Sequence, residues 1–265
     1  MASAPQNPGL PIFYQDLVPL NSRDHGSWHS RSVDKAKWLV GQHAIPLTVE
    51  EFPQAARNFP IIFSSGEDSV PLALMGLNEG VNVFVDDEGT FLENVYVPAY
   101  ARRYPFMLAR LTPEAQELSL CFDPTSDLVG EFDDGAALFD GDQPSETTKG
   151  MLGFCEQFEQ AGLRSTAFVK ELEKHGLLID GEVAIQQEGP DATPGQPPFV
   201  YRGFRMVDQA KLQEVRGDVL RGWNQSGLLP LVFAHLFSLD LMREIFGRQV
   251  AQGKMPQPVP VLPTV

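Results

Sequence analysis

Residues 97–106 read Val-Pro-Ala-Tyr-Ala-Arg-Arg-Tyr-Pro-Phe, and residues 82–89 read Asn-Val-Phe-Val-Asp-Asp-Glu-Gly. The earlier stretch predicts a strand that closes in a tight turn, because β-branched and aromatic residues give way to Asp-Glu-Gly. The later stretch predicts a short helix that starts after Pro98. A strand, a turn and a helix in close succession favour an α+β fold.

On the N-terminal side, short apolar runs at 59–64, 70–77 and 81–85 are separated by turn residues at hairpin-like distances. Thr48 and Glu51 have the spacing of a helix-capping pair, and Pro60 is expected to end that helix. Residues 16–122 are therefore predicted to form a mostly antiparallel sheet with one or two short helices against it.

On the C-terminal side, apolar residues recur at helical spacing from Ser145 to His175, and Ser145 is a suitable N-cap. A strand is expected at 183–187, a helix after Asp208, and a last helix over 228–246. Residues 145–252 are predicted to be a helix-rich half that packs against the sheet.

The two halves are joined by an acidic link, 123–144. Between Arg110 and Lys149 the chain has ten acidic residues and no Lys or Arg, so most of this stretch is expected to be solvated. We predict a single domain over 16–252, a flexible N-terminal arm at 1–15, and an extended tail at 253–265 that contains four prolines.

Composition excludes several classes of function. A net charge of −15 argues against nucleic acid as a partner, because phosphate binding needs clustered Lys and Arg. No stretch has the length of a membrane span, and the first fifteen residues do not resemble a secretory signal, so a cytoplasmic location is expected. Two cysteines, Cys121 and Cys155, are too few for a disulfide framework, and Cys155 is expected to be a core residue.

Motifs for phosphate-loop, dinucleotide, serine-hydrolase and zinc-protease chemistry do not occur in the sequence. His25 and His29 are four residues apart, but they lack an obvious third ligand, and we expect them to be exposed side chains. No metal and no cofactor is predicted.

The candidate binding residues are Tyr100, Arg102, Arg103 and Tyr104. On a helix after Pro98, the two tyrosines share one face and Arg103 lies beside Tyr100. The arginines could pair internally with Asp86, Asp87 or the acidic stretch, or they could bind an anionic or peptide carboxylate ligand. Under the second hypothesis, Arg103→Ala weakens partner binding and leaves the fold largely intact.

Asp86 and His235 complete the candidate set. Asp86 lies at the turn after the predicted strand, where a turn role is favoured over acid–base chemistry. His235 lies in an apolar stretch, so it is expected to be a buried histidine anchored by hydrogen bonds, with a role as a base or a ligand-orienting group as the alternative.

Several segments together resemble the SapC family of bacterial proteins, over about residues 15–247. They are Leu-Val-Pro-Leu-Asn at 17–21, Ala-Ile-Pro-Leu at 44–47, Glu-Phe-Pro at 51–53, Phe-Pro-Ile-Ile-Phe at 59–63, Asn-Val-Phe-Val-Asp at 82–86, Tyr-Val-Pro-Ala-Tyr at 96–100, Arg-Tyr-Pro-Phe at 103–106, Leu-Phe-Asp at 138–140, Gly-Phe-Arg-Met-Val-Asp at 203–208 and Ala-His-Leu-Phe-Ser-Leu at 234–239. The peptide-transport permease that shares the name is a different protein, since the sequence lacks membrane spans.

The resemblance implies a role connected with the cell surface or with uptake, because the family is named after a surface-layer locus. It also implies a partner linked to TonB-dependent receptors or to tryptophan-halogenase-like proteins. We therefore expect a non-enzymatic accessory or binding protein that recognises a protein, a peptide or a small anionic ligand. The alternatives are an enzyme for a peptide or amino-acid-derived substrate, with His235 as base and Arg102 and Arg103 as carboxylate clamp, and a structural protein of the surface layer.

Overall fold

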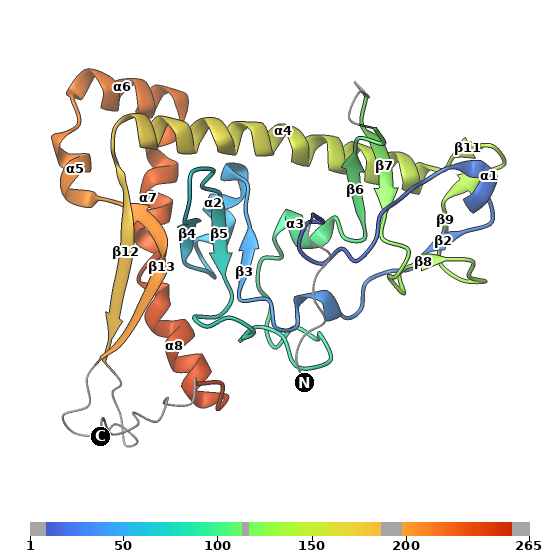
Figure 1. The fold of residues 1–265 in the computed structure, drawn as a ribbon, viewed down its shortest axis with the longest axis horizontal. Helices are drawn as coiled ribbons and strands as arrows, with labels where there is room; N and C mark the ends of the chain where they lie inside the picture. The colour runs from blue at the N-terminus through green and yellow to red at the C-terminus, as the bar shows by residue number, and fades with distance from the viewer. Residues whose placement is uncertain (1–8, 113–116, 187–197, 256–265) are drawn as a thin grey trace, which may run out of the picture.

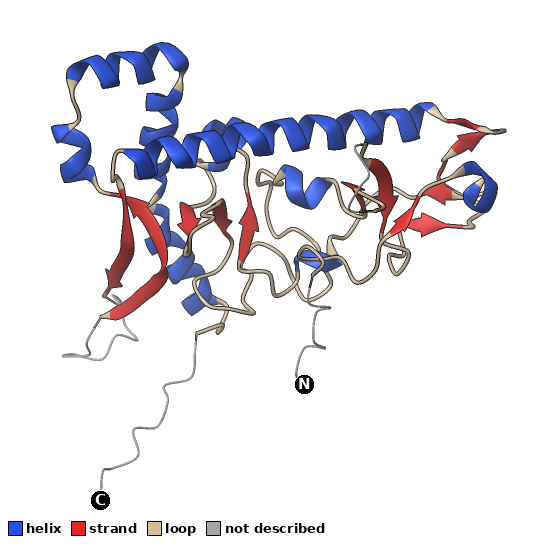
Figure 2. Cartoon of the chain, turned by 45° about the horizontal axis from the view of Figure 1, so that its top comes forward, coloured by secondary structure: helices blue, strands red, loops and turns tan. Residues whose placement is uncertain are grey.

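The structure is a computed structural model, and it describes residues 9–112, 117–186 and 198–255. All strand pairs between named strands are antiparallel, and helices dominate the C-terminal half, which confirms the α+β prediction. The long helix α4 runs along one side of the molecule, and the sheets lie beneath it (Figures 1 and 2).

The largest sheet has five strands in the order β12-β13-β4-β5-β3. These strands span Leu178–Ile185, Phe199–Val207, Ile61–Ser64, Pro71–Leu74 and Ala44–Pro46. The hairpin β12–β13 comes from the C-terminal half and joins the N-terminal strands where Phe204 pairs with Ser64. One sheet therefore contains strands from both halves of the chain.

Three smaller sheets lie toward the other end of the molecule (Figure 1). The first contains β1, β7 and β6, at Val18–Pro19, Ser119–Phe122 and Phe106–Ala109. The second contains β8, β2 and β9, at Val129–Gly130, His29–Ser30 and Ala136–Ala137. The third pairs β10 with β11, at Phe139–Asp140 and Gln143–Pro144.

Short helical turns connect the strands of the N-terminal half. They are α1, η1, η2, α2 and α3, at Ser22–His25, Lys37–Leu39, Val49–Glu51, Phe52–Ala55 and Ala99–Arg102. The C-terminal helices are α4 to α8, at Glu146–Lys174, Gln209–Glu214, Gly217–Ser226, Leu228–Ser238 and Leu241–Ala251. No helix in the described part of the chain is long and apolar enough to cross a membrane.

Helix α4 connects two separate hydrophobic cores. Its 29 residues span about 43 Å at 1.5 Å per residue. Near its start, Cys155 is buried in the smaller core around Phe106 and Phe122, as expected for a core cysteine. Near its end, Phe168 and Leu172 belong to the larger core, where Phe168 packs on Phe63 of the five-stranded sheet. The helix therefore holds the small sheets and the large sheet in one body.

Local capping signals set the starts of the helices, as predicted. Thr48 and Glu51 form a complete capping box, and the Ser145 hydroxyl accepts the Thr148 N–H at 3.3 Å. Asp208 accepts the Ala210 N–H at 3.0 Å at the start of α5.

Several predicted elements differ from the structure. The strand expected at 183–187 is the longer β12, Leu178–Ile185, and residue 187 lies outside the described residues. The strand expected at 81–85 is reduced to a single bridge between Val85 and Phe91, because the Asn82 side chain accepts the Phe84 N–H at 2.9 Å in place of a ladder bond. The helix expected after Asp208 divides at 215–216.

The last helix, expected at 228–246, divides after Ser238. The Ser238 hydroxyl donates to the His235 carbonyl at 2.7 Å and accepts the Ile61 N–H at 2.8 Å, which ties the end of α7 to β4. The chain then turns and starts α8 at Leu241.

The predicted arm at 1–15 is partly packed: Phe13 and Tyr14 are buried, and the Tyr14 hydroxyl donates to the Phe106 carbonyl at 2.7 Å. Residues 1–8 of the arm, and 256–265 of the tail, lie outside the described residues.

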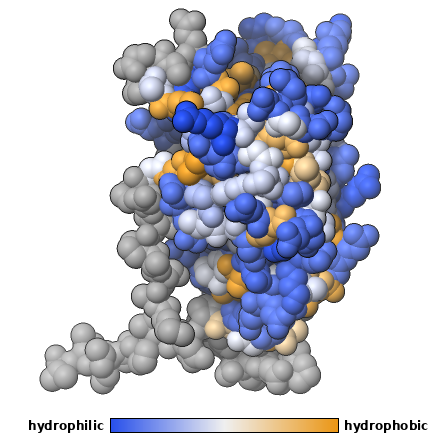
Figure 3. Space-filling model, turned by 90° about the vertical axis from the view of Figure 1, so that its right-hand side faces the viewer, coloured by the Kyte–Doolittle hydropathy of each residue, from blue (hydrophilic) through white to orange (hydrophobic). Residues whose placement is uncertain are grey.

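The acidic stretch carries several of the short strands, and its described acids are mainly exposed. The face of the molecule drawn in Figure 3 is mainly hydrophilic, with small apolar patches. Among the acids, Asp123 is an exception, because it is fully buried and accepts hydrogen bonds from Gln15 N and Thr125 N. A buried carboxylate needs such donors, and here the N-terminal segment supplies one of them.

Candidate functional site

A buried carboxylate, that of Glu51, caps the start of helix α3. Glu51 Oε1 accepts the Ala99 N–H at 2.6 Å and the Tyr96 hydroxyl at 3.0 Å. Its other oxygen, Oε2, accepts Thr48 N–H at 2.8 Å and the Thr48 hydroxyl at 2.9 Å. Glu51 is only 5% exposed, and this one side chain caps the starts of two helices, η2 through Thr48 and α3 through Ala99.

Arg103, the residue after α3, is buried rather than presented to solvent. Its guanidinium lies between the rings of Tyr100 and Phe158, 4.4 and 4.3 Å from their centroids. Arg103 Nη1 pairs with Glu159 Oε1 at 3.4 Å, while Nε has no partner among the described residues. The expected internal pairing exists, but the partner is a carboxylate of α4 and not Asp86, Asp87 or the acidic stretch.

Arg102 is the exposed arginine of the pair. Its Nε donates to the Val97 carbonyl at 3.0 Å, and its Nη2 donates to the Tyr96 hydroxyl at 3.3 Å. The guanidinium lies 5.2 Å from the Phe154 ring centroid. Arg102 forms no ion pair with any carboxylate in the described ranges. Tyr96 and Val97 therefore hold the Arg102 guanidinium, which pairs directly with no carboxylate of the described residues.

Tyr100 and Tyr104 are both buried, as their shared helix face would allow. Phe13 packs on both rings, with centroid distances of 5.4 Å to Tyr100 and 6.1 Å to Tyr104. The Tyr100 hydroxyl donates to the Ile12 carbonyl at 3.2 Å. Burial raises the pKa of Tyr104 to about 12, so its hydroxyl is neutral at physiological pH. The tyrosines fix the N-terminal segment over α3.

A cavity of about 100 Å³ lies between β2, α3 and α4. Arg31, Arg102 and Arg103 line it together with Tyr104, Phe154 and Cys155, and we call it the arginine cleft. Arg31 binds Asp134 Oδ1 through Nε at 2.8 Å and Nη2 at 2.6 Å, and it lies 3.7 Å over the Phe132 ring. Three of the four candidate residues around α3 thus reach one concave site, and Arg31, which the sequence did not single out, joins them.

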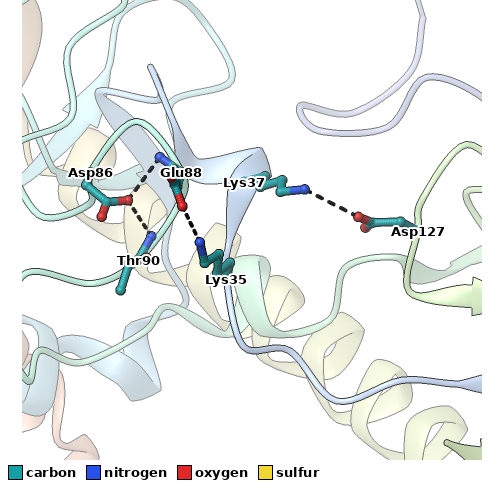
Figure 4. Close-up of polar contacts among 6 residues, drawn as sticks. All are labelled: Lys35, Lys37, Asp86, Glu88, Thr90 and Asp127. Carbon is teal, nitrogen blue, oxygen red and sulfur yellow. Dashed lines mark hydrogen bonds and ion pairs between the residues drawn. The ribbon is translucent and has the colours of Figure 1, made fainter. Parts of the chain in front are cut away.

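Asp86 lies outside the arginine cleft, in a turn, as the sequence pattern predicted. Its Oδ1 accepts N–H groups of Glu88 at 3.0 Å and Thr90 at 2.8 Å (Figure 4). These donors hold the pKa of Asp86 below its usual range. Lys35 pairs with Glu88, which ties this turn to the segment just before η1.

Lys37, on η1, extends toward the acidic stretch and lies 3.6 Å from Asp127 (Figure 4). Gly89, in the turn, has a φ of +85°, and a Cβ there would lie 2.5 Å from Lys37 N. Only glycine lets the turn approach η1 this closely.

His235, on α7, is fully buried and does not line the arginine cleft. Its imidazole bridges the backbones of β4 and β13. Its Nδ1–H donates to the Ile61 carbonyl at 2.7 Å, and its Nε2 accepts the Val207 N–H at 3.0 Å. Burial lowers the pKa of His235 to about 4. Both ring nitrogens are engaged with backbone, as expected for an anchored core histidine.

His25 is buried, although it was expected to be exposed. Its Nδ1 accepts the Asn21 N–H at 3.2 Å, and its ring packs edge-on against Trp28 and Phe122. No group of three His, Cys, Asp or Glu residues in the described part of the chain could hold a metal ion.

Sequence patterns could not reveal Glu51 or Glu159 as partners of this site. Glu51 fits a capping box, which explains it without Ala99 forty-eight residues away. Glu159 is one acid among many on α4. Only the packing of α4 against α3 shows that it faces Arg103.

The geometry defines an α+β protein with an arginine-lined cleft between a short helix and a long one. The family model for SapC matches residues 20–245, and the chain belongs to the SapC family. No curated protein and no solved structure matches the chain.

Proposed function

We propose that this chain is a non-enzymatic binding protein that recognises a carboxylate group of a protein or peptide at the arginine cleft. The observation that supports this is the meeting of Arg31, Arg102 and Arg103 at one cavity in a chain of net charge −15. A guanidinium offers a planar pair of donors that matches a carboxylate. Arg102, which has no acidic partner in the described ranges, is the residue proposed to make the main contact.

The size of the cleft favours a group on a larger partner. A volume of about 100 Å³ is well below the roughly 300–1,000 Å³ of pockets that enclose whole small molecules. It suits a carboxylate from a chain end or from an acidic side chain, with the remaining partner lying on the surface. Phe154 and Met151 in the lining offer apolar contact beside the charge.

The resemblance that first indicated the family supports the choice of partner. In this proposal the protein acts in the bacterial cytoplasm with a component of a TonB-dependent uptake system or with a tryptophan-halogenase-like enzyme. The acidic surface would keep the protein soluble and would disfavour acidic partners except where the arginines are exposed.

The alternative, an enzyme with His235 as base, has weaker support. A general base needs a free lone pair within reach of its substrate, and His235 Nε2 accepts the Val207 N–H inside the core. Arg102 and Arg103 line a cavity from which His235 is absent.

Arg102→Gln should lower the affinity for a carboxylate-ended peptide at least about tenfold, because a charge-assisted hydrogen bond contributes roughly 1.5–3 kcal/mol. The measurement uses a displayed library of peptides with free C-termini, selected on the wild-type protein. Enriched peptides are then titrated by calorimetry, each beside its C-terminally amidated form. Arg102→Gln should leave the unfolding free energy within about 0.5 kcal/mol, because the side chain is exposed.

Arg243→Gln is the matched control. Arg243 is also exposed, and its substitution changes the net charge by the same amount at a position outside the arginine cleft. It should bind as wild type does. The proposal fails if no peptide is enriched, if amidation has no effect, or if both arginine variants weaken binding equally. Arg103→Ala is a poorer test than the sequence indicated, because removing this buried side chain also removes packing against Tyr100 and Phe158.

A further inference from the structure

The five-stranded sheet has two unlike faces. Ile61, Phe63, Ala73 and Ile45 are fully buried on one of them. On that face the Phe63 ring lies 5.0 Å from the imidazole of His235 on α7, and also packs on α4. Helices therefore cover this side of the sheet.

The other face carries a hollow of about 410 Å³. Alternate residues of β4 and β5 point to this side, so Ile62 and Leu72, which are direct cross-strand partners, lie together in its lining. Leu74 and Ala44 form a second cross-strand pair there, and Met242 of α8 contributes from the side. The floor of the hollow is thus apolar.

A bulge brings an aromatic residue to the same face. Gly181 pairs with Phe204, but Val183 pairs with Tyr201, so β13 has one extra residue between these two pairs. Gly203 lies within this bulge at a φ of +92°, which favours glycine. Without the extra residue, Tyr201 and Phe204 would point to opposite faces. With it, both line the hollow.

The polar side chains in the lining of the hollow are mainly uncharged; they are His43, Ser64, Ser65, Asn78 and Tyr201, with Glu79 and Arg202 as the charged ones. The Tyr201 hydroxyl is buried and has no hydrogen-bond partner among the described residues. Burial lowers the pKa of His43, so its imidazole is neutral at pH 7. Arg202 pairs with Glu182 at 2.6 Å, and Glu79 leaves the rim with a negative charge. The surroundings therefore disfavour an anionic ligand.

We propose that this hollow, which we call the sheet hollow, binds a neutral, largely apolar small molecule that carries one hydrogen-bond-accepting oxygen. Its volume falls in the roughly 300–1,000 Å³ range of small-molecule sites, and its lining combines an apolar floor with polar side chains that are mainly uncharged. Tyr201 donates to the acceptor oxygen, which satisfies a buried hydroxyl that has no partner among the described residues. The sheet hollow and the arginine cleft share no lining residue, so this site is independent of the carboxylate site.

Nile red is a suitable probe, because it is neutral and apolar and has a carbonyl oxygen, and its emission shifts to the blue in an apolar site. We expect saturable binding to the full chain at a one-to-one ratio. Tyr201→Phe should weaken binding about three- to tenfold, which corresponds to the loss of one hydrogen bond. Leu72→Trp should abolish it by filling the hollow. Near-ultraviolet circular dichroism shows which variants are folded.

Phe237→Ser is the control for binding at the surface. Phe233 and Phe237 stack at 5.7 Å on the exposed side of α7 and form the competing apolar patch. The proposal is supported if Phe237→Ser and Arg102→Gln bind the dye as wild type does while the two hollow variants do not. It is overturned if wild type shows no saturable binding, if Phe237→Ser abolishes binding, or if folded Tyr201→Phe and Leu72→Trp bind unchanged.

Discussion

Glu51→Ala should destabilise the protein by about 3–5 kcal/mol, since removing one member of a buried polar network leaves its partners unpaired. The Glu51 carboxylate is 5% exposed and is the acceptor for Thr48, Tyr96 and Ala99. Its loss leaves the Ala99 N–H without an acceptor at the start of α3. Urea unfolding monitored by circular dichroism measures the change in free energy.

Glu50→Ala is the matched control, because Glu50 is the neighbouring acid, is exposed, and pairs with Arg164 on the surface. Surface ion pairs contribute roughly 0–1 kcal/mol, so this variant should remain close to wild type. Equal losses in the two variants would show that the buried network adds nothing beyond a general charge effect.

The same substitution has a consequence for the arginine cleft. Tyr96 accepts a hydrogen bond from Arg102 and donates one to Glu51, so the three residues form a chain from the core to the surface. At temperatures where the Glu51→Ala variant is still folded, Tyr96 no longer has the Glu51 carboxylate as its acceptor. The Tyr96 hydroxyl therefore orients the Arg102 guanidinium less firmly. Tyr96→Phe breaks the chain at lower cost, and it should weaken peptide binding less than Arg102→Gln does.

The second large effect is a dependence of stability on pH that arises from His235. Burial lowers the pKa of this imidazole to about 4 from the 6.5 of the unfolded chain. The unfolded state therefore binds the proton first, and the stability that is fully present above pH 6.5 is lost as the pH falls to 4. A difference of about 2.5 units corresponds to about 3 kcal/mol.

The measurement is the unfolding free energy of wild type and His235→Gln from pH 7.5 to 4.5. Carboxylates contribute to both curves, so the difference in slope between them isolates the histidine. Wild type should lose more stability on acidification than His235→Gln, even though the variant starts lower. Imidazole NMR signals give an independent check: His235 should remain neutral at pH 5 in the folded protein. Parallel curves together with a protonated imidazole at pH 5 would contradict the assignment.

The sequence predicted the parts of the fold that depend on neighbouring residues. Thr48 with Glu51, Ser145 and Asp208 each cap a helix through atoms two or three residues away, so the signal lies in a short window. The family was also recognisable, because its motifs are contiguous stretches of sequence. His235 was correctly predicted to be buried and hydrogen-bonded, since a histidine in an apolar stretch must find partners.

The identities of those partners were decided by tertiary structure alone. Ile61 is 174 residues from His235, and Glu159 is 56 residues from Arg103, so no local pattern connects them. The same is true of the hairpin β12–β13, which joins the N-terminal strands of the large sheet through β4. Pairings of this kind depend on how α4 and the sheets pack as whole bodies. Local hydrogen bonds fix where each element starts, whereas burial of the shared apolar surface fixes which elements meet and therefore where the two candidate sites form.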